Sequence, residues 1–183
     1  MKTYISLLRG INVSGKNRIG MSELKGLFES LSMTNVATYI QSGNVIFDRA
    51  DQDPASLARS IEAEITRSFG ASVSVFLRDN NQFQQIIENN PFLNQRNEDP
   101  EKLHVTFLSD SPSESVLSNL ILPVGTPDEF MVYDKGIYLF CPNGYGRTKI
   151  SNSFFERKLG LSATTRNWKT VMALYEIANQ RHA

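Results

Sequence analysis

The sequence contains little cysteine or histidine and has no excess charge of either sign. Its 183 residues include one cysteine, Cys141, so neither an internal disulfide nor a cysteine-pair metal site can form. The histidines, His104 and His182, are far apart in the sequence, and no His-x-x-x-His spacing points to a metal site. A lone cysteine fits a reducing, cytoplasmic setting. The 19 basic and 19 acidic residues argue against a general polyanion binder.

Long apolar runs are absent as well. The run from Tyr4 to Leu8 is too short for the apolar region of a signal peptide, and no stretch approaches the ~20 apolar residues of a membrane span. We therefore expect no membrane partner. With 40% apolar and 21% charged residues, the composition is that of a soluble globular protein.

The charges that are present are unevenly distributed. Three cations and no acid lie between Arg9 and Ser22, and six cations accompany Glu156 alone between Asn143 and Tyr175. If the fold brings these two segments together, they form one positive face. The alternative is two separate solvated surfaces.

The first half of the chain alternates strand and helix patterns. Short β-rich runs and helices with apolar residues at helical spacing give the order strand, helix, strand, strand, helix, strand. We expect the first helix to be capped by Ser22 and the two middle strands to be joined by a tight Ser42-Gly43 turn. The predicted elements are TYISLL, a helix after Ser22, NVATYIQ, NVIFD, a helix from Asp53-Pro54 to Gly70, and SVSVFL.

The second half repeats this pattern after a helical connector. A strand at 104–109, a short helix from Pro112 and a hairpin at 129–141 precede a helix ended by Gly160. A last helix begins near Trp168, with Arg166 and Lys169 at its start. We predict an α+β fold of two tandem ferredoxin-like (βαββαβ-type) repeats packed as one unit, the second with an extra C-terminal helix. The predicted boundaries are 1–78 for the first repeat, 79–102 for the connector, and 103–183 for the second repeat with its helix.

Three stretches carry a family resemblance that covers essentially the whole chain. They are YISLLRGINVSGKNRIGMSELKGLFESL, TNVATYIQSGNVIF and TTRNWKTVMALYEIA. They resemble the bacterial family known as domain of unknown function 1697. The resemblance implies a cytosolic α+β protein of two ferredoxin-like repeats, and it brings no established activity or catalytic residue.

The stretch RGINVSGKNRIG resembles a nucleotide-binding phosphate loop. It places Gly10, Gly15 and Lys16 at the spacing of GxxxxGK[ST]. However, Asn17 replaces the magnesium-binding hydroxyl residue, and the helix starts too late. The hairpin that follows also excludes the parallel sheet that such a loop requires. We therefore reject a nucleotide hydrolase.

What remains is a long, flexible, cationic loop that can bind an anion. A second loop of the same kind, NGYGRTKIS, begins at Asn143, and the turn QSGN begins at Gln41. Surface turns use the same residue types for backbone reasons, so a solvated connection is the alternative. NGYG also resembles the start of an RNA-binding motif, but the aromatic residues that should follow are missing. The candidate ligand contacts are Arg9, Asn12, Lys16, Arg18, Gln41, Asn44, Tyr145, Arg147 and Lys149.

We predict a binding module for a phosphorylated metabolite or a nucleic acid, with residues 9–18 and 143–149 sharing one site. We predict no cofactor and no metal. One alternative is an enzyme acting on a small metabolite in the same cleft, with Asn12, Gln41 or Asn44 as polar contacts. A Cys141–His104 thiolate pair is disfavoured, because a lone cysteine on an apolar strand is usually an inert core residue. Another alternative is a protein-interaction module that uses an exposed sheet face.

Overall fold

The computed structural model describes residues 1–181, so His182 lies outside the described part. Two four-stranded antiparallel sheets and the helices around them make the chain an α+β protein. The described residues form two compact units, the first comprising Met1–Gln84 with the segment from Ala173 onward and the second comprising Gln85–Met172. The chain changes unit inside two helices, α3 (Asn80–Glu88) and α7 (Trp168–Asn179). Within residues 1–181, no helix is long and apolar enough to cross a membrane.

The first unit follows the predicted order of elements. These are β1 (Lys2–Leu8), α1 (Met21–Ser30), β2 (Thr34–Tyr39), β3 (Asn44–Arg49), α2 (Pro54–Phe69) and β4 (Val75–Asp79), with sheet order β2-β3-β1-β4. The side chain of Asp53 accepts a hydrogen bond from Ser56 N and Gly70 ends α2 at a φ of 65°, as the sequence predicts.

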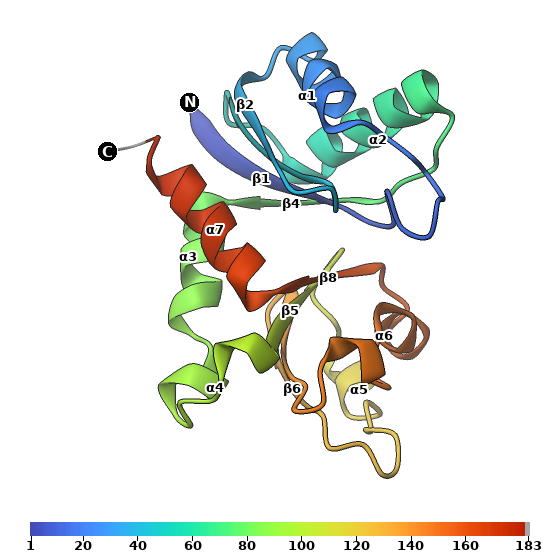
Figure 1. The fold of residues 1–183 in the computed structure, drawn as a ribbon, viewed down its shortest axis with the longest axis vertical. Helices are drawn as coiled ribbons and strands as arrows, with labels where there is room; N and C mark the ends of the chain where they lie inside the picture. Colours follow the sequence, from blue (N-terminus) through green and yellow to red (C-terminus); the bar gives the residue numbers. More distant parts are fainter. Residues whose placement is uncertain (182–183) are drawn as a thin grey trace. The chain divides into compact units, whose positions relative to one another are not determined.

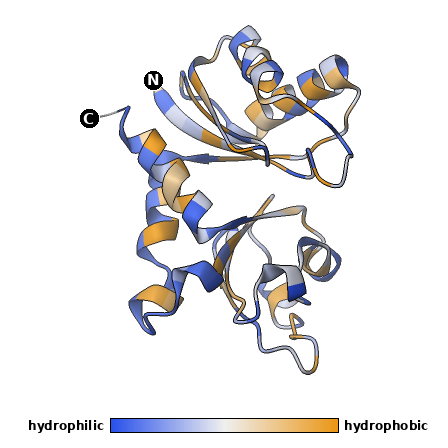
Figure 2. Ribbon diagram, viewed as in Figure 1, coloured by the Kyte–Doolittle hydropathy of each residue, from blue (hydrophilic) through white to orange (hydrophobic). Residues whose placement is uncertain are grey.

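Helices α1 and α2 lie on the same face of this sheet (Figure 1). Both carry hydrophobic and hydrophilic residues, as expected for helices with one buried side (Figure 2). Leu24 and Phe28 of α1 and Ile61 and Ile65 of α2 are buried in one cluster with strand residues such as Phe47. This core fixes the β1–α1 connection at one end of the sheet.

The second unit has the same sheet order, β6-β7-β5-β8. Its elements are α4 (Pro91–Asn94), β5 (Leu103–Leu108), α5 (Glu114–Leu117), β6 (Glu129–Tyr133), β7 (Gly136–Phe140), α6 (Asn152–Leu159) and β8 (Ala163–Asn167), with 3-10 turns η1 (Pro100–Lys102) and η2 (Tyr145–Arg147). Its core joins the sheet to α6 through Phe154, Phe155 and Leu159.

Three local expectations were wrong. Helix α1 is capped by Gly20 and not by Ser22, which lies inside the helix. The loop between β2 and β3 runs from Ile40 to Gly43, because Tyr39 already pairs with Asn44. Residues 163–167 form strand β8 rather than the approach to the last helix. Trp168, at the start of α7, is 6% exposed and belongs to the core.

Candidate functional site

The glycine-rich loop between β1 and α1 folds back on itself as a small hairpin. Val13 and Lys16 pair as an antiparallel bridge, and Lys16 N donates to Val13 O at 3.0 Å. Below them, Asn12 N donates to Asn17 O at 3.1 Å. Backbone N–H groups of this loop therefore bond within the loop itself rather than wrapping a phosphate.

The two residues at the tip of this hairpin explain the second glycine of the motif. Ser14 has a φ of 51° and Gly15 a φ of 76°. Positive φ at both central residues is the signature of a type I′ turn, which joins antiparallel strands tightly. Gly15 thus serves a hairpin turn, and the spacing that resembles a nucleotide loop has a different structural cause.

The start of helix α1 is already occupied by a carboxylate of the chain. Gly20 N donates to Glu23 Oε2 at 3.2 Å. A carboxylate at this position satisfies a free N–H group and interacts favourably with the positive end of the helix. Since α1 begins only at Met21, Lys16 lies outside the first helical turn, unlike a phosphate-loop lysine.

Asn12 holds the hairpin against the neighbouring turn. Its side-chain nitrogen donates to Ile19 O and to Gln41 O, both at 2.9 Å. Its side-chain oxygen accepts from Ile19 N at 2.9 Å. The predicted contacts Asn12 and Gln41 are therefore adjacent, but the Asn12 amide serves the protein's own backbone.

Gly43 of the β2–β3 turn packs closely against the end of β1 and the start of the loop. Leu8 N donates to Gly43 O at 2.8 Å. A Cβ at Gly43 would lie 2.7 Å from Ile11 Cδ1 and 2.9 Å from Leu8 Cβ, so only glycine fits. The neighbouring Asn44 is fully buried, and its side-chain nitrogen donates to Tyr39 O and to a serine hydroxyl, each at 2.9 Å.

Together the hairpin, the start of α1 and the β2–β3 turn border a surface depression of about 520 Å³. Its lining residues are Asn12, Gly15, Arg18, Ile19, Gly20, Glu23 and Gln41. Lys16 and Arg18 are exposed and make no ion pair within residues 1–181, whereas Arg9, at the base of the loop, is half-buried. The structure thus brings Asn12, Arg18 and Gln41 together around one hollow.

The second candidate loop lies in the other unit. The Tyr145 ring stacks on the His104 ring with centroids 4.8 Å apart, and Lys149 Nζ donates to Val124 O at 3.3 Å. Arg147 is exposed. Each basic loop therefore belongs to a separate compact unit, and a ligand site shared by both remains a prediction.

The candidate thiol is poorly suited to nucleophilic chemistry. Cys141 is fully buried, and burial raises the pKa of its thiol to about 11, helped by the charge of Asp128. Burial also lowers the pKa of His104, which leaves that ring neutral near pH 7. A protonated thiol is a weak nucleophile, and the burial of Cys141 confirms the prediction that it is a core residue.

Sequence reasoning missed two buried arginines. Arg166 was expected on the last helix but lies on β8, 8% exposed, and burial lowers its pKa to about 10. Its Nη1 donates to Thr165 O at 3.0 Å. Arg78 of β4 is 7% exposed and likewise donates to the preceding carbonyl, Leu77 O, at 2.8 Å. Each arginine is the fourth residue of the last strand in its half, a match that becomes visible only once β8 is known to be a strand.

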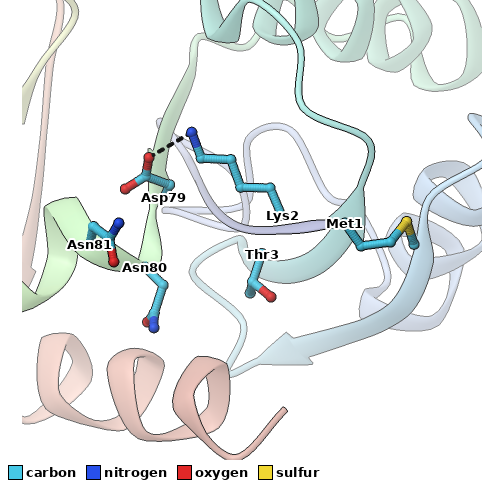
Figure 3. A pocket seen from close by; sticks show the side chains of 6 residues that line it. All are labelled: Met1, Lys2, Thr3, Asp79, Asn80 and Asn81. Atoms are coloured by element: carbon cyan, nitrogen blue, oxygen red, sulfur yellow. Dashed lines mark ion pairs between the residues drawn. The ribbon is translucent and has the colours of Figure 1, made fainter. Parts of the chain in front are cut away.

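A further hollow of about 360 Å³ lies beside the N-terminal end of β1 (Figure 3). Lys2 Nζ forms ion pairs there with Asp79 at 3.0 Å and with Asp51 at 3.4 Å. The Asp79 hydrogen bond is the main cause that raises the pKa of Lys2. Asp79 also accepts from Gln82 N at 2.9 Å and so caps α3. Lys2 is already paired with two carboxylates, whereas Lys16 and Arg18 have no acidic partner within residues 1–181, so an anionic ligand is expected at the loop rather than in this hollow.

Comparison with known proteins places the chain in a family. A model described as "Protein of unknown function (DUF1697)" matches residues 1–138. The chain belongs to the DUF1697 family. Among solved structures, it is similar to the conserved bacterial protein SP0830 from Streptococcus pneumoniae, with 26% identity and a TM-score of 0.72 over 97% of this chain and 98% of that one. No curated protein matches this DUF1697 member significantly.

Proposed function

We propose that this DUF1697 protein binds a phosphate-bearing ligand at the depression formed by the 12–20 hairpin, the start of α1 and Gln41. The observation that carries the proposal is the pair of exposed cations, Lys16 and Arg18, which have no acidic partner within residues 1–181. Other cations of the first unit do have acidic partners: Lys2 pairs with Asp79 at 3.0 Å and Lys25 pairs with Glu29 at 3.8 Å. A depression of about 520 Å³ has the size of a small-molecule site, which favours a phosphorylated metabolite over a nucleic acid.

Each of the side chains at the depression can contact a different part of the ligand. Arg18, Glu23 and Gln41 line the depression, and Lys16 follows the lining residue Gly15 in the hairpin. The planar Arg18 guanidinium can bind two phosphate oxygens at once, and Lys16 supplies a point charge. Gln41 and the Glu23 carboxylate offer hydrogen-bond acceptors, which suit the hydroxyl groups of a sugar. Because a Glu23 oxygen already bonds Gly20 N, the phosphate is expected on the Lys16 and Arg18 side.

We further propose that the two halves are tandem ferredoxin-like repeats. Support comes from their common element order and from matching strand registers: Tyr4 pairs with Phe47 and Asp79, and His104 pairs with Leu139 and Asn167.

A cytoplasmic location is part of the same proposal, because a lone reduced cysteine suits a reducing compartment.

The enzyme alternative has less support than simple binding. Within residues 1–181, no group of histidine, cysteine, aspartate and glutamate side chains is arranged to hold a metal ion. Two of the proposed substrate contacts, Asn12 and Asn44, already use their amide nitrogens on the protein. The depression therefore offers binding groups without a matched acid, base or nucleophile.

The test is a thermal-shift screen with nucleotides, sugar phosphates and short RNA, repeated with variants. A ligand that binds the native state raises the melting temperature by mass action. We expect Lys16→Ala and Arg18→Ala to abolish most of the shift and Lys25→Ala, which removes an exposed lysine of α1, to preserve it. Arg147→Ala tests the shared site, since it reduces the shift only if both loops contact the ligand.

Two results would reject the anion site. One is the absence of any shift with phosphate-bearing compounds. The other is a shift that Lys16→Ala and Arg18→Ala leave unchanged while raising NaCl concentration also has no effect, because exposed charge contacts weaken with salt.

A further inference from the structure

The outer edge of strand β6 is unprotected. In the second sheet β6 pairs with β7 alone, in unbroken register from Glu129–Phe140 to Tyr133–Gly136. Within residues 1–181 no strand pairs with its other side. An edge strand presents a row of backbone N–H and C=O groups that can pair with another strand.

The equivalent edge of the first unit carries a protective irregularity that β6 lacks. The register of β2 shifts between Thr34 and Ala37, where Asn35 takes a φ of 51°. Bulges, prolines and lysines within the strand are the usual means of blocking an edge. The sequence of β6, EFMVY, contains none of these. Its one charge, on Glu129, is bound by Arg96 at 2.7 Å.

One face of β6 also leaves large apolar side chains in water. Met131 is 47% exposed and Tyr133 is 39% exposed, and because they are two residues apart they point to the same side of the sheet. Phe130 and Val132 point to the other side and pack against the core. The strand therefore combines a free edge with an exposed apolar pair.

We propose that β6 pairs with β6 of a second copy of the chain, antiparallel and about a two-fold axis at Val132, which makes the protein a dimer with an eight-stranded sheet. This inference is independent of the anion site. In the joined sheet, the hydrophobic cores of the two copies must lie on the same face. Since side chains alternate between the two faces along a strand, odd-numbered residues of one β6 must then lie opposite odd-numbered residues of the other.

A two-fold axis at Val132 pairs the exposed apolar side chains with each other. It places Met131 opposite Tyr133 of the second copy, twice by symmetry, and directly opposite apolar pairs stabilise a sheet. It also brings Glu129, which is paired with Arg96, toward the β6–β7 turn of the second copy, where Lys135 is paired with Asp110 at 3.0 Å. An axis at Met131 would instead set Glu129 against the Tyr133 ring. The strand is thus complementary to itself, as a two-fold interface requires.

The first test measures the mass of the protein in solution by light scattering or sedimentation over a range of concentrations. We expect a wild-type dimer and a monomeric Met131→Lys variant, because a lysine at this edge leaves an unpaired charge in the interface. Ile121→Lys, at a residue 73% exposed outside β6, is the matched control and should remain dimeric. Tyr133→Lys is a second interface variant, and melting curves verify that all variants are folded.

The second test determines the register. Met131→Cys mixed with Tyr133→Cys should form a mixed disulfide on oxidation, whereas Met131→Cys alone should cross-link poorly, because diagonal positions lie farther apart than opposite ones. Native Cys141 is fully buried and does not compete. A monomeric wild type at about 100 μM, well above the micromolar affinity of many specific interfaces, would overturn the proposal. So would a dimer that survives both lysine substitutions, or a cross-link confined to Met131→Cys alone.

Discussion

At the residue scale, left-handed backbone positions decide how the candidate site is built. Glycines and asparagines of the β1–α1 loop carry several of the positive φ angles in the first unit. Their presence was visible in the sequence, and it predicted a loop able to turn sharply. Their purpose was not visible, because the same glycine spacing serves a phosphate loop and a type I′ hairpin turn.

Gly43 and Gly10 offer a matched comparison at this scale. Both have positive φ, 80° and 70°, but a Cβ at Gly10 would have no atom within 4 Å, whereas one at Gly43 would overlap Ile11 and Leu8. We expect Gly10→Ala to cost about 1 kcal/mol of unfolding free energy from backbone strain, and Gly43→Ala about 2–4 kcal/mol because overpacking is added. Urea denaturation of the two variants measures the difference, and equal losses would show that the turn can shift away from the loop.

At the element scale, local signals predicted most of the fold. The Asp53-Pro54 start and Gly70 end of α2 are decided by residues within that helix, and the structure confirms them. Strand β8 was missed because Ala163–Asn167 lacks the large apolar residues that mark a buried strand. Arg166 is one of its buried residues, and no local pattern distinguishes a buried arginine from a solvated one.

The geometry of the candidate site likewise could not be predicted from local sequence signals. Proximity of the β1–α1 loop to the β2–β3 turn depends on sheet register, which places Leu7 opposite Asn44. The sequence could name Asn12 and Gln41 as polar candidates. It could not show that the Asn12 amide would be used on Gln41 O and on Ile19 O.

This use of Asn12 leads to a prediction for the whole loop. Asn12 and Asn17 both have positive φ, but Asn12 makes three side-chain bonds with two backbone segments. Within the described part of the chain, the Asn17 side chain donates only to Gly10 O at 3.2 Å. We expect Asn12→Ala to lose about 2–3 kcal/mol more stability than Asn17→Ala, since it leaves partly buried polar groups unpaired. Hydrogen exchange at Ile19 N, which should accelerate only in Asn12→Ala, provides the measurement. Equal exchange in both variants would contradict the role of Asn12.

At the scale of the whole molecule, the first unit is completed by residues that follow the second unit in the chain. Arg181 forms an ion pair with Asp48 of β3 at 3.5 Å, and Asp48 also accepts from Thr3 Oγ1 at 2.6 Å and Asn35 Nδ2 at 2.7 Å. Burial alone would raise the pKa of Asp48, but these three partners outweigh it and lower the pKa below its usual value.

The pH dependence of stability follows from that direction. A carboxylate whose pKa is lower in the folded state stabilises the protein above its unfolded pKa of about 3.9, and this contribution is lost as the pH falls through the folded pKa. We expect Asp48→Asn to be about 1–3 kcal/mol less stable than wild type at pH 7, with the gap closing as the pH falls below the unfolded pKa of about 3.9 and through the lower folded pKa. Urea midpoints from pH 2 to pH 7 check this. Asp53→Asn, at an exposed helix cap, serves as the control for losing a single acid elsewhere. A gap that stays constant with pH would show that the Asp48 charge does not contribute.

Because the chain returns to its first unit at its C-terminal end, the parts of that unit are synthesised at different times. The ribosome releases β1 to β4 first, then the whole second unit, and only afterwards the segment that contains Arg181. While the second unit is being made, Asp48 has its Thr3 and Asn35 partners but lacks the guanidinium. The earliest-made unit is therefore the last to be finished, and a nascent chain stalled within the second unit should carry an incompletely stabilised N-terminal sheet.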